Sequence, residues 1–452
     1  MVRGNRPGIS GIKQPVESIR FSRYSGLVTL EDAGPTTLSP ARTRLALLAL
    51  ALGGFGIGST EFVAMGLLPN LASDLLPGLY ASDSAAANSQ AGLLISAYAL
   101  GVVVGAPTIA AAAARWPRKK LLLALLTAFT LGTVASAVLP SFQLVLLARF
   151  VAALPHGAYF GIASLVAASL MGPGKRGRGV AFVLSGLTIA NVIGVPAITW
   201  IGQLYGWRVA YLVVAGIFAL TFVAVALAVP WQAGDPTATM RNELKAFTRL
   251  QVWFALAIGA IGFGGLFAVY SYVAPMATEV TGLPAAAVPL VLVVFGIGMT
   301  IGNIVGGRLA DHSVRRSMYL FFGILIVALV VMGFTVSTVA GLLAGVFFVG
   351  GTSAALSPII QTRLMDVARD SQSIAAALNH SALNIGNALG ALLGGIAIGA
   401  GLGYVAPIWI GLGLSIAGLL LAVATFAIDR ARRTRGVEVP YGTAAMAAVG
   451  EA

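Results

Sequence analysis

A series of long apolar segments limits the folds open to this chain more than any other feature. A hydrocarbon core about 30 Å thick needs roughly 20 apolar residues in each helix that crosses it. The 452-residue sequence contains twelve such segments, near residues 45–68, 90–112, 119–139, 142–170, 179–203, 208–230, 252–275, 287–308, 317–337, 339–362, 374–400 and 405–428. Only 10% of the residues are charged, whereas a soluble domain carries roughly 25%. The pattern excludes a soluble enzyme and predicts an all-α polytopic membrane protein with twelve transmembrane helices in a lipid bilayer.

The positions of the basic residues predict how these helices are oriented. Loops on the cytoplasmic side of a membrane carry an excess of Lys and Arg. Almost all of the 28 Lys and Arg residues lie in the two tails and in every second loop between the apolar segments. We therefore expect both termini to be cytoplasmic. The net charge of +13 then reflects orientation, so we expect no nucleic-acid partner.

The chain contains two repeated halves. Tyr98–Gly105 matches Phe295–Gly302, and Asn191–Gly194 aligns with Asn387–Gly390. Parallel six-helix repeats are typical of transporters that rock around a site between the halves. The predicted regions are a disordered cytoplasmic tail (1–43), a first half (44–230), a cytoplasmic central loop (231–251), a second half (252–428) and a cytoplasmic C-terminal tail (429–452).

Three motifs point to one family: Gly56–Pro69 in the first segment, Pro155–Gly161 in the fourth and Gly401–Pro407 before the twelfth. Over about residues 44–428 the chain resembles the drug/proton antiporters of the major facilitator superfamily, in particular bacterial chloramphenicol-resistance and arabinose-efflux exporters. The resemblance implies a major facilitator fold in the bacterial inner (cell) membrane. It also implies export of small amphiphilic compounds, phenicol-like or multidrug, in exchange for protons by alternating access. No cofactor beyond the proton gradient and no partner subunit are expected, so the protein would function as a monomer.

The resemblance also implies gating residues. The family's cytoplasmic loop motif is well preserved at Gly307–Arg316, and its first-half copy keeps the basic residues but has Ala114 in place of the acid. In the family this loop latches the cytoplasmic side, although anchoring by basic residues is an alternative reading. The antiporter motif of span five is approximate, and ordinary glycine packing is its alternative. The predicted gating residues are Arg115, Arg118, Lys119, Gly194, Pro196, Asp311, Arg315 and Arg316.

Two charged residues lie well inside apolar segments, Glu61 in the first and Arg149 in the fourth. A charge at mid-helix costs roughly 2.5–3.5 kcal/mol on insertion scales, so each needs a function or a partner. Both lie about 12 Å below the outer end of their helix, and the same depth permits an ion pair. The resemblance makes Glu61 the proton carrier and Arg149 its modulator, with a static salt bridge as the alternative. His156, in the fourth segment, titrates near neutral pH when unperturbed and is a candidate proton relay, with helix packing as the alternative.

Aromatic and amide side chains in the apolar segments are candidate cargo contacts. Aromatic rings suit flat lipophilic molecules and amides can hydrogen-bond cargo, although both types also hold helices together. The candidate substrate-binding residues are Phe62, Tyr159, Asn191, Phe267, Tyr270, Asn384 and Asn387. In the repeat, Phe267 takes the position of Glu61. We therefore expect proton coupling in the first half and cargo binding mainly in the second.

The sequence leaves a scaffold or receptor role open, and it leaves one close alternative among transporters. An exporter of sugars, polyols or nucleosides would use the same fold and the Asn-rich segment at 374–400. A membrane-embedded enzyme would need clustered acids, a set of metal ligands or a nucleophile–base pair. The sequence shows none of these, so we expect no enzymatic activity and no metal site. We do not expect an ATP-driven pump, because Gly172–Arg176 lacks the spacing and the hydroxyl of a phosphate-binding loop.

Overall fold

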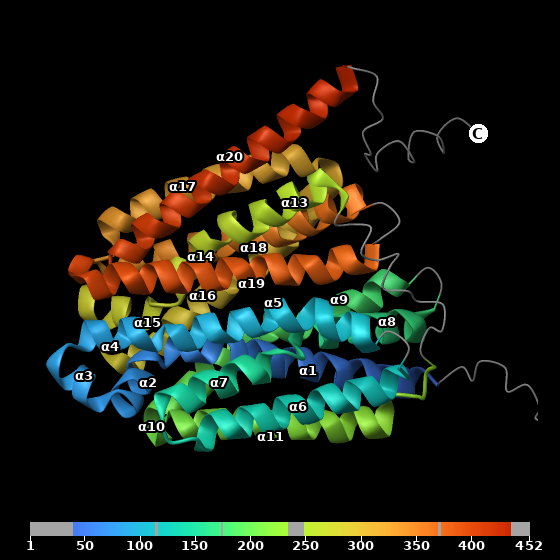
Figure 1. Cartoon of the computed structure of the whole chain (residues 1–452), viewed down its shortest axis with the longest axis horizontal. Coiled ribbons are helices and arrows are strands. Elements are labelled where there is room, and N and C mark those ends of the chain that lie inside the picture. The colour runs from blue at the N-terminus through green and yellow to red at the C-terminus, as the bar shows by residue number, and fades with distance from the viewer. Residues whose placement is uncertain (1–38, 114–115, 173–174, 234–247, 369–371, 435–452) are drawn as a thin grey trace, which may run out of the picture. The chain divides into compact units, whose positions relative to one another are not determined.

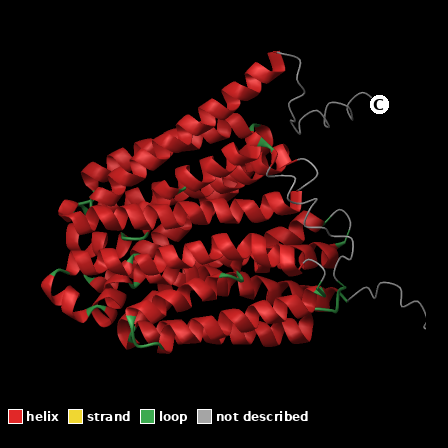
Figure 2. Cartoon of the chain, in the orientation of Figure 1, coloured by secondary structure: helices red, strands yellow, loops and turns green. Residues whose placement is uncertain are grey.

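Helices make up nearly all of the described structure (Figure 1). The structure, a computed structural model, describes residues 39–113, 116–172, 175–233, 248–368 and 372–434. No strand occurs in these ranges, as Figure 2 shows. Most of the predicted N-terminal tail and of the predicted central loop lie outside the described residues, as does the end of the chain.

The first half consists of helices because a backbone in lipid must satisfy its N–H and C=O groups within its own segment. Its elements are α1 (Pro40–Gly66), α2 (Leu68–Leu75), α3 (Pro77–Ser82), α4 (Ser84–Ala91), α5 (Leu93–Ala113), α6 (Arg118–Val138), α7 (Phe142–Ala153), α8 (His156–Met171), α9 (Arg176–Ile189), the π-helix η1 (Ala190–Gly194), α10 (Val195–Tyr205) and α11 (Trp207–Ala228).

The second half repeats this pattern. Its elements are α13 (Leu250–Ala257), the π-helix η3 (Ile258–Gly262), α14 (Gly264–Tyr270), α15 (Val273–Pro275), the π-helix η4 (Met276–Val280), the 3₁₀-helix η5 (Ala285–Ala287), α16 (Val288–His312), α17 (Val314–Thr335), α18 (Val339–Ala368), α19 (Gln372–Ala397), the π-helix η6 (Ile398–Leu402) and α20 (Ala406–Thr434). In the described residues, twelve helical spans are long and apolar enough to cross a membrane. The predicted fold of twelve transmembrane helices in two six-helix halves is confirmed.

The segment between the first two spans is helical as well. Pro69 and Pro77 lie in the first turns of α2 and α3, where a missing N–H breaks no helical hydrogen bond. Asp83 caps α4 by accepting a hydrogen bond from the backbone N–H of Ala86 at 2.9 Å. In Figure 1 these short helices lie on the left, whereas α1 begins and α20 ends on the right. We call the right-hand side the tail side and the other the opposite side.

Several spans are interrupted or longer than predicted. Pro155, which has no N–H to donate, separates α7 from α8, so the fourth span is broken just before His156. α18 and α20 continue past their predicted ends at 362 and 428. Arg363 and Asp429 were predicted to lie in a loop and in the C-terminal tail. They instead lie inside helices, 1% and 2% exposed, and form a buried ion pair.

The repeated glycines allow corresponding helices to approach closely. A Cβ built on Gly105 of α5 would lie 2.0 Å from the carbonyl oxygen of Leu154, at the end of α7. In the second half, a Cβ on Gly302 of α16 would lie 1.8 Å from the carbonyl oxygen of Gly351 in α18. These distances leave no room for a side chain. The sequence repeat therefore encodes the same close helix pair in each half.

Gly105→Ala is expected to destabilise the first half, because the new methyl group would overlap the backbone at Leu154. Overpacking of this kind costs about 1–3 kcal/mol. The matched control is Gly161→Ala in α8, where a built Cβ meets no atom within 4 Å and Ala is the better helix former. Thermal unfolding of both purified variants in detergent would measure the difference. Equal melting temperatures would contradict the packing argument.

Candidate functional site

Glu61 lies at the junction of the two halves. Its side chain is buried in α1, and Oε1 accepts a hydrogen bond from Nδ2 of Asn387 in α19 at 3.3 Å. Since α1 belongs to the first half and α19 to the second, any separation of the halves here must break this bond. The surroundings of the acid therefore depend on how the halves are arranged.

Arg149 of α7 is near Glu61 but does not pair with it. Its Nη1 donates to the carbonyl oxygen of Thr60 at 2.9 Å and to the Thr60 hydroxyl at 3.3 Å. The guanidinium carbon lies 4.3 Å from the ring centroid of Tyr98 and 5.4 Å from that of Tyr211. In the described part of the chain, which includes both residues, no ion pair joins Glu61 to Arg149. The ion pair that equal depth suggested is therefore not formed, because a backbone carbonyl and two ring faces hold the cation.

Aromatic rings from both halves meet next to Glu61. Phe62 of α1 stacks on Phe267 of α14 with ring centroids 6.3 Å apart, and it contacts Tyr270 at 5.5 Å. Tyr270 in turn stacks on Phe295 of α16 at 4.1 Å. The rings are all buried. Three predicted substrate residues, Phe62, Phe267 and Tyr270, are thus brought together. With Phe295 they form a group of four rings that we call the aromatic cluster.

Other predicted substrate residues use their polar groups elsewhere. The Tyr159 hydroxyl donates to the carbonyl oxygen of Leu50 at 2.9 Å, and its ring packs against those of Phe129 and Phe160. Tyr159 therefore joins α8 to α1 and lies apart from the aromatic cluster. Asn191 and Asn384 each donate Nδ2 to a backbone carbonyl one turn earlier in their own helix. Of the predicted amides, Asn387 is the one that contacts Glu61.

His156 contacts the side chains of Tyr98 and His380. Its Nδ1 lies 3.3 Å from the hydroxyl of Tyr98 in α5. Its ring centroid is 6.2 Å from that of His380 in α19, which stacks on Phe160 at 5.3 Å. Tyr98 was not among the predicted site residues, although a hydroxyl among apolar neighbours just before Gly101 was a usable signal. The described residues contain no group of three or more His, Cys, Asp or Glu side chains that could hold a metal ion.

Two predicted gating residues bind the end of the first half on the tail side. Arg118 donates its backbone N–H to the carbonyl oxygen of Gln232 at 3.0 Å. Lys119 Nζ donates to the carbonyl oxygen of Ala226 in α11 at 2.7 Å. Gln232 also donates Nε2 to the hydroxyl of Ser169 in α8 at 2.8 Å. These contacts join the third span to the fourth and sixth within one half.

The remaining gating residues fall in three places. Gly194 ends η1, where a Cβ would lie 2.7 Å from the ring of Phe55 in α1, and Pro196 follows in the first turn of α10. Asp311, Arg315 and Arg316 are exposed at the turn between α16 and α17. Arg115 lies outside the described residues. Span five is therefore packed closely against α1 at Gly194, which both the antiporter motif and ordinary glycine packing allow.

Hydrogen bonds join the two halves toward the opposite side. Asn88 of α4 donates Nδ2 to the hydroxyl of Tyr404 at 2.7 Å, and the Ser89 hydroxyl donates to the carbonyl oxygen of Gly395 at 2.6 Å. Burial raises the pKa of the Tyr404 hydroxyl above its ordinary value, so it stays neutral. These bonds hold α4 against α19 and the chain that follows η6.

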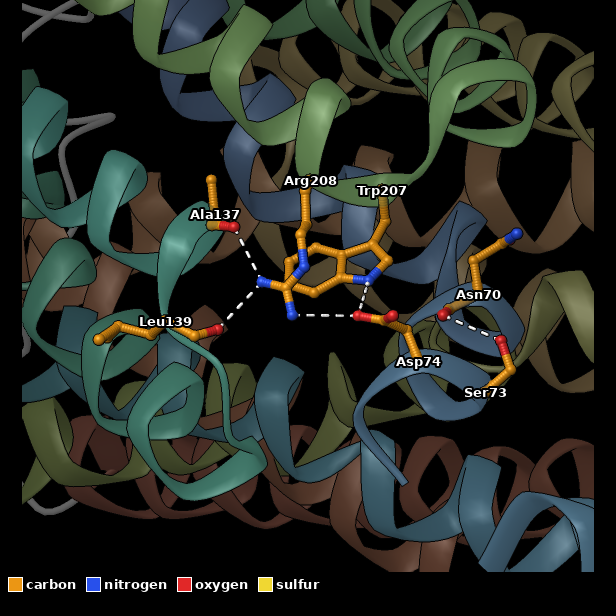
Figure 3. A network of polar contacts seen from close by, with 7 residues as sticks. All are labelled: Asn70, Ser73, Asp74, Ala137, Leu139, Trp207 and Arg208. Atoms are coloured by element: carbon orange, nitrogen blue, oxygen red, sulfur yellow. Dashed lines mark hydrogen bonds and ion pairs between the residues drawn. The ribbon is translucent and has the colours of Figure 1, made fainter. Parts of the chain in front are cut away.

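A second polar network holds the first half together on the opposite side. Figure 3 shows Asp74, whose Oδ2 accepts from Arg208 Nη2 at 3.1 Å and from Trp207 Nε1 at 3.0 Å. Arg208 Nη1 also donates to the carbonyl oxygens of Ala137 and Leu139. The network ties α2, the short helix after the first span, to the end of α6 and the start of α11, so these three helices are braced against one another.

Comparison with known sequences gives a consistent family assignment. The model of the Major Facilitator Superfamily matches residues 50–291 and 253–448. The "Inner membrane transport protein YdhP" of Escherichia coli strain K12 is 39% identical over 376 residues, which are 83% of this chain and 94% of the relative. The "Chloramphenicol resistance protein" of Streptomyces lividans is 33% identical over 384 residues, 84% of this chain and 94% of that protein.

Solved structures show the same fold. A D-xylose–proton symporter superimposes with a TM-score of 0.67 at 16% identity, over 84% of this chain and 97% of its own. A bacterial homologue of the human lysosomal transporter Spinster, inward-facing and unoccupied, superimposes with a TM-score of 0.60 at 18% identity, over 86% and 96% of the two chains. At these identities the likeness concerns the fold alone.

Proposed function

This chain belongs to the Major Facilitator Superfamily and is a transporter, and from that premise we propose that it exports a small amphiphilic compound in exchange for protons. The two halves would rock about a central site, opening it to each side in turn. The observation that carries the proposal is Glu61. It is a buried carboxyl in one half, held by Asn387 of the other half and adjacent to the aromatic cluster.

The geometry suggests how proton and cargo exclude each other. Burial opposes a charge on Glu61, while the guanidinium of Arg149 nearby supports one. Arg149 is held by Thr60 and by two rings, so Glu61 can gain or lose a proton without a salt bridge being broken. Cargo entering between the halves would separate Phe62 from Phe267 and take the place of the Asn387 amide. Release of the proton would then accompany cargo binding.

The cargo class follows from the groups around the acid. Rings from Phe62, Phe267 and Tyr270, one amide and one carboxyl suit a flat, neutral or weakly cationic molecule. The name of the Streptomyces relative supports a phenicol-like cargo. We include Asn384 and Asn191 as groups that could bind cargo once the halves separate, and His156 as a proton relay.

We place the tail side in the cytoplasm, since Arg118, Lys119, Arg315 and Arg316 all lie there and cytoplasmic loops are enriched in basic residues. In this orientation the bonds of Asn88 and the Asp74 network face outward. Arg118 and Lys119 would hold the inner end of the first half, and Pro196, next to the tight contact at Gly194, would allow span five to kink. The described arrangement then joins the halves on the outer side.

Reconstituted vesicles with an imposed pH gradient would test this function. The panel is chloramphenicol, a lipophilic phosphonium cation, a pentose and a nucleoside, each added to vesicles with and without the protein. Chloramphenicol or the phosphonium cation is expected to drive saturable proton flux against the cargo movement. A response to the pentose or nucleoside alone would support the polar-cargo alternative. Cargo uptake without any proton movement would contradict proton antiport.

A further inference from the structure

Polar side chains continue from Glu61 toward the tail side along both halves. In the first half, Arg149 lies over Tyr98, and the Tyr98 hydroxyl reaches His156. In the second half, Asn387 binds Glu61, and His380 lies two turns earlier in α19. The two series end at the same place, because the rings of His156 and His380 are 6.2 Å apart.

The first-half series is positioned by close helix packing. Gly101 and Gly105 of α5 have no space for a Cβ against the backbone of Phe150 and Leu154, and a Cβ on Gly157 would lie 2.3 Å from Cβ of Ala106. Tyr98 lies one turn before Gly101, and the break at Pro155 makes His156 the first residue of α8. The contact between the Tyr98 hydroxyl and Nδ1 of His156 is therefore built into a rigid helix pair.

The second-half series lies on one face of α19. His380, Asn384 and Asn387 are spaced four and three residues apart, which places them on the same side of a helix. Seven residues of helix span about 10 Å, so the face that holds Glu61 extends to the histidine pair. Oδ1 of Asn384, Oδ1 of Asn387 and Nε and Nη2 of Arg149 are buried without a protein partner. Buried polar atoms of this kind are commonly paired by bound water.

We propose that Tyr98 and His380, with His156 between them, form the route by which protons pass between Glu61 and the tail side; this rests on the proposed function. With hydrogen on Nε2, His156 accepts from Tyr98 through Nδ1. A proton arriving at the Tyr98 oxygen displaces the hydroxyl proton to Nδ1 of His156. The proton on Nε2 of His156 then leaves to His380, which passes one proton to water. One proton moves, and Tyr98 and His156 keep no charge. His156 is left with its hydrogen on Nδ1, so it returns to the Nε2 tautomer before the next proton passes.

The route depends on the arrangement of the halves. Tyr98 and His156 belong to the first half and His380 to the second, so separation on the tail side interrupts the last transfer. The titratable and charged groups facing this route are Glu61 from α1, Tyr98 from α5, Arg149 from α7, Tyr211 from α11 and His380 from α19. Since Asn88 and Ser89 join the halves on the opposite side, the described arrangement directs the proton to the tail side.

Two substitutions with matched controls test the route. Tyr98→Phe removes the hydroxyl that contacts His156, and its control is Tyr205→Phe, since Tyr205 is exposed at the end of α10. His380→Gln removes the second-half acceptor, and its control is His312→Gln at the exposed end of α16. Each is assayed in vesicles with the panel member that gives proton flux in the wild type. Cargo counterflow, which needs no net proton movement, reports folding and cargo binding.

Tyr98→Phe and His380→Gln are expected to slow proton-coupled transport by about a hundredfold, the lower end of the usual contribution of a proton-transfer group. They should also shift its pH profile while counterflow stays within about twofold of wild type. Both controls should behave like the wild type. Imidazole in the buffer should partly restore coupled transport in His380→Ala.

Other outcomes separate the possible failures. If Glu61→Gln loses coupling while Tyr98→Phe and His380→Gln keep the wild-type rate and pH profile, the route is wrong and the proposed function stands. If His380→Gln also loses counterflow and imidazole restores nothing in His380→Ala, His380 is structural and the route is overturned. If no panel member moves protons in the wild type, the proposed function fails and the route fails with it.

Discussion

Glu61→Gln is expected to abolish proton-coupled transport while the protein remains folded. Glutamine cannot carry a proton, but its amide oxygen can still accept the hydrogen bond from Asn387. The substitution also removes the cost of a buried charge, roughly 2.5–3.5 kcal/mol on insertion scales, so thermal stability should be unchanged or higher. Coupled transport should fall by about a hundredfold or more. Proton flux in vesicles, with counterflow as the folding control, measures the effect.

The matched control for this variant is Glu279→Gln. Glu279 lies in η4 on the opposite side and is exposed, so losing its charge should leave coupling and counterflow as in the wild type. Glu61→Asp should keep partial coupling, because a shorter acid can still exchange a proton. Normal proton flux in Glu61→Gln would show that the acid is structural and would refute the mechanism proposed for it.

Asp429→Asn is expected to give the largest loss of stability. Asp429 of α20 and Arg363 of α18 are almost fully buried, and Arg363 also contacts Gln251 at 3.2 Å and the ring of Phe426. Asn in place of Asp429 breaks this buried ion pair from one side, and removing one partner of such a pair typically costs about 3–5 kcal/mol. The thermal unfolding temperature in detergent should fall markedly. The double variant Arg363→Met with Asp429→Leu should recover most of the loss, because apolar side chains then replace both members of the buried pair.

An ion pair in the first half provides the comparison. Asp74 and Arg208 are 47% and 36% exposed, and exposed pairs contribute about 0–1 kcal/mol. In Asp74→Asn, Arg208 keeps its bonds to the carbonyl oxygens of Ala137 and Leu139 (Figure 3). Its unfolding temperature should therefore change little. If Asp74→Asn and Asp429→Asn unfolded at the same temperature, burial would not be the source of the expected effect.

Much of the fold was predictable because the requirements of lipid are local. A span must be long, apolar and internally hydrogen-bonded, and each of these properties is visible in about 20 consecutive residues. The glycines of the repeat, Gly105 and Gly302, were visible for the same reason, and the structure places both against a neighbouring backbone. Span ends were less predictable. Helices α18 and α20 continue beyond the apolar segment because Arg363 and Asp429 satisfy each other inside the protein.

The site was predictable residue by residue but not as a set of partners. Glu61 and Arg149 stood out because a charge in an apolar segment is costly. Their equal depth suggested an ion pair, but depth carries no information about the direction in which each helix faces. Arg149 donates to the carbonyl oxygen of Thr60 and lies over the ring of Tyr98. The carboxyl of Glu61 instead accepts a hydrogen bond from Asn387. Tyr159 was predicted to bind substrate together with the other aromatic residues, but its hydroxyl donates a hydrogen bond to the carbonyl oxygen of Leu50.

Three features of this protein follow from the sequence alone: twelve spans, two repeated halves, and an acid inside an apolar segment of the first half. Which side chains meet was decided only by the tertiary structure: Glu61 with Asn387, His156 with His380, and Arg363 with Asp429. The physical reason is that burial in lipid acts on each segment by itself. A contact between helices depends instead on their rotation and register, which the packing of all the spans sets together.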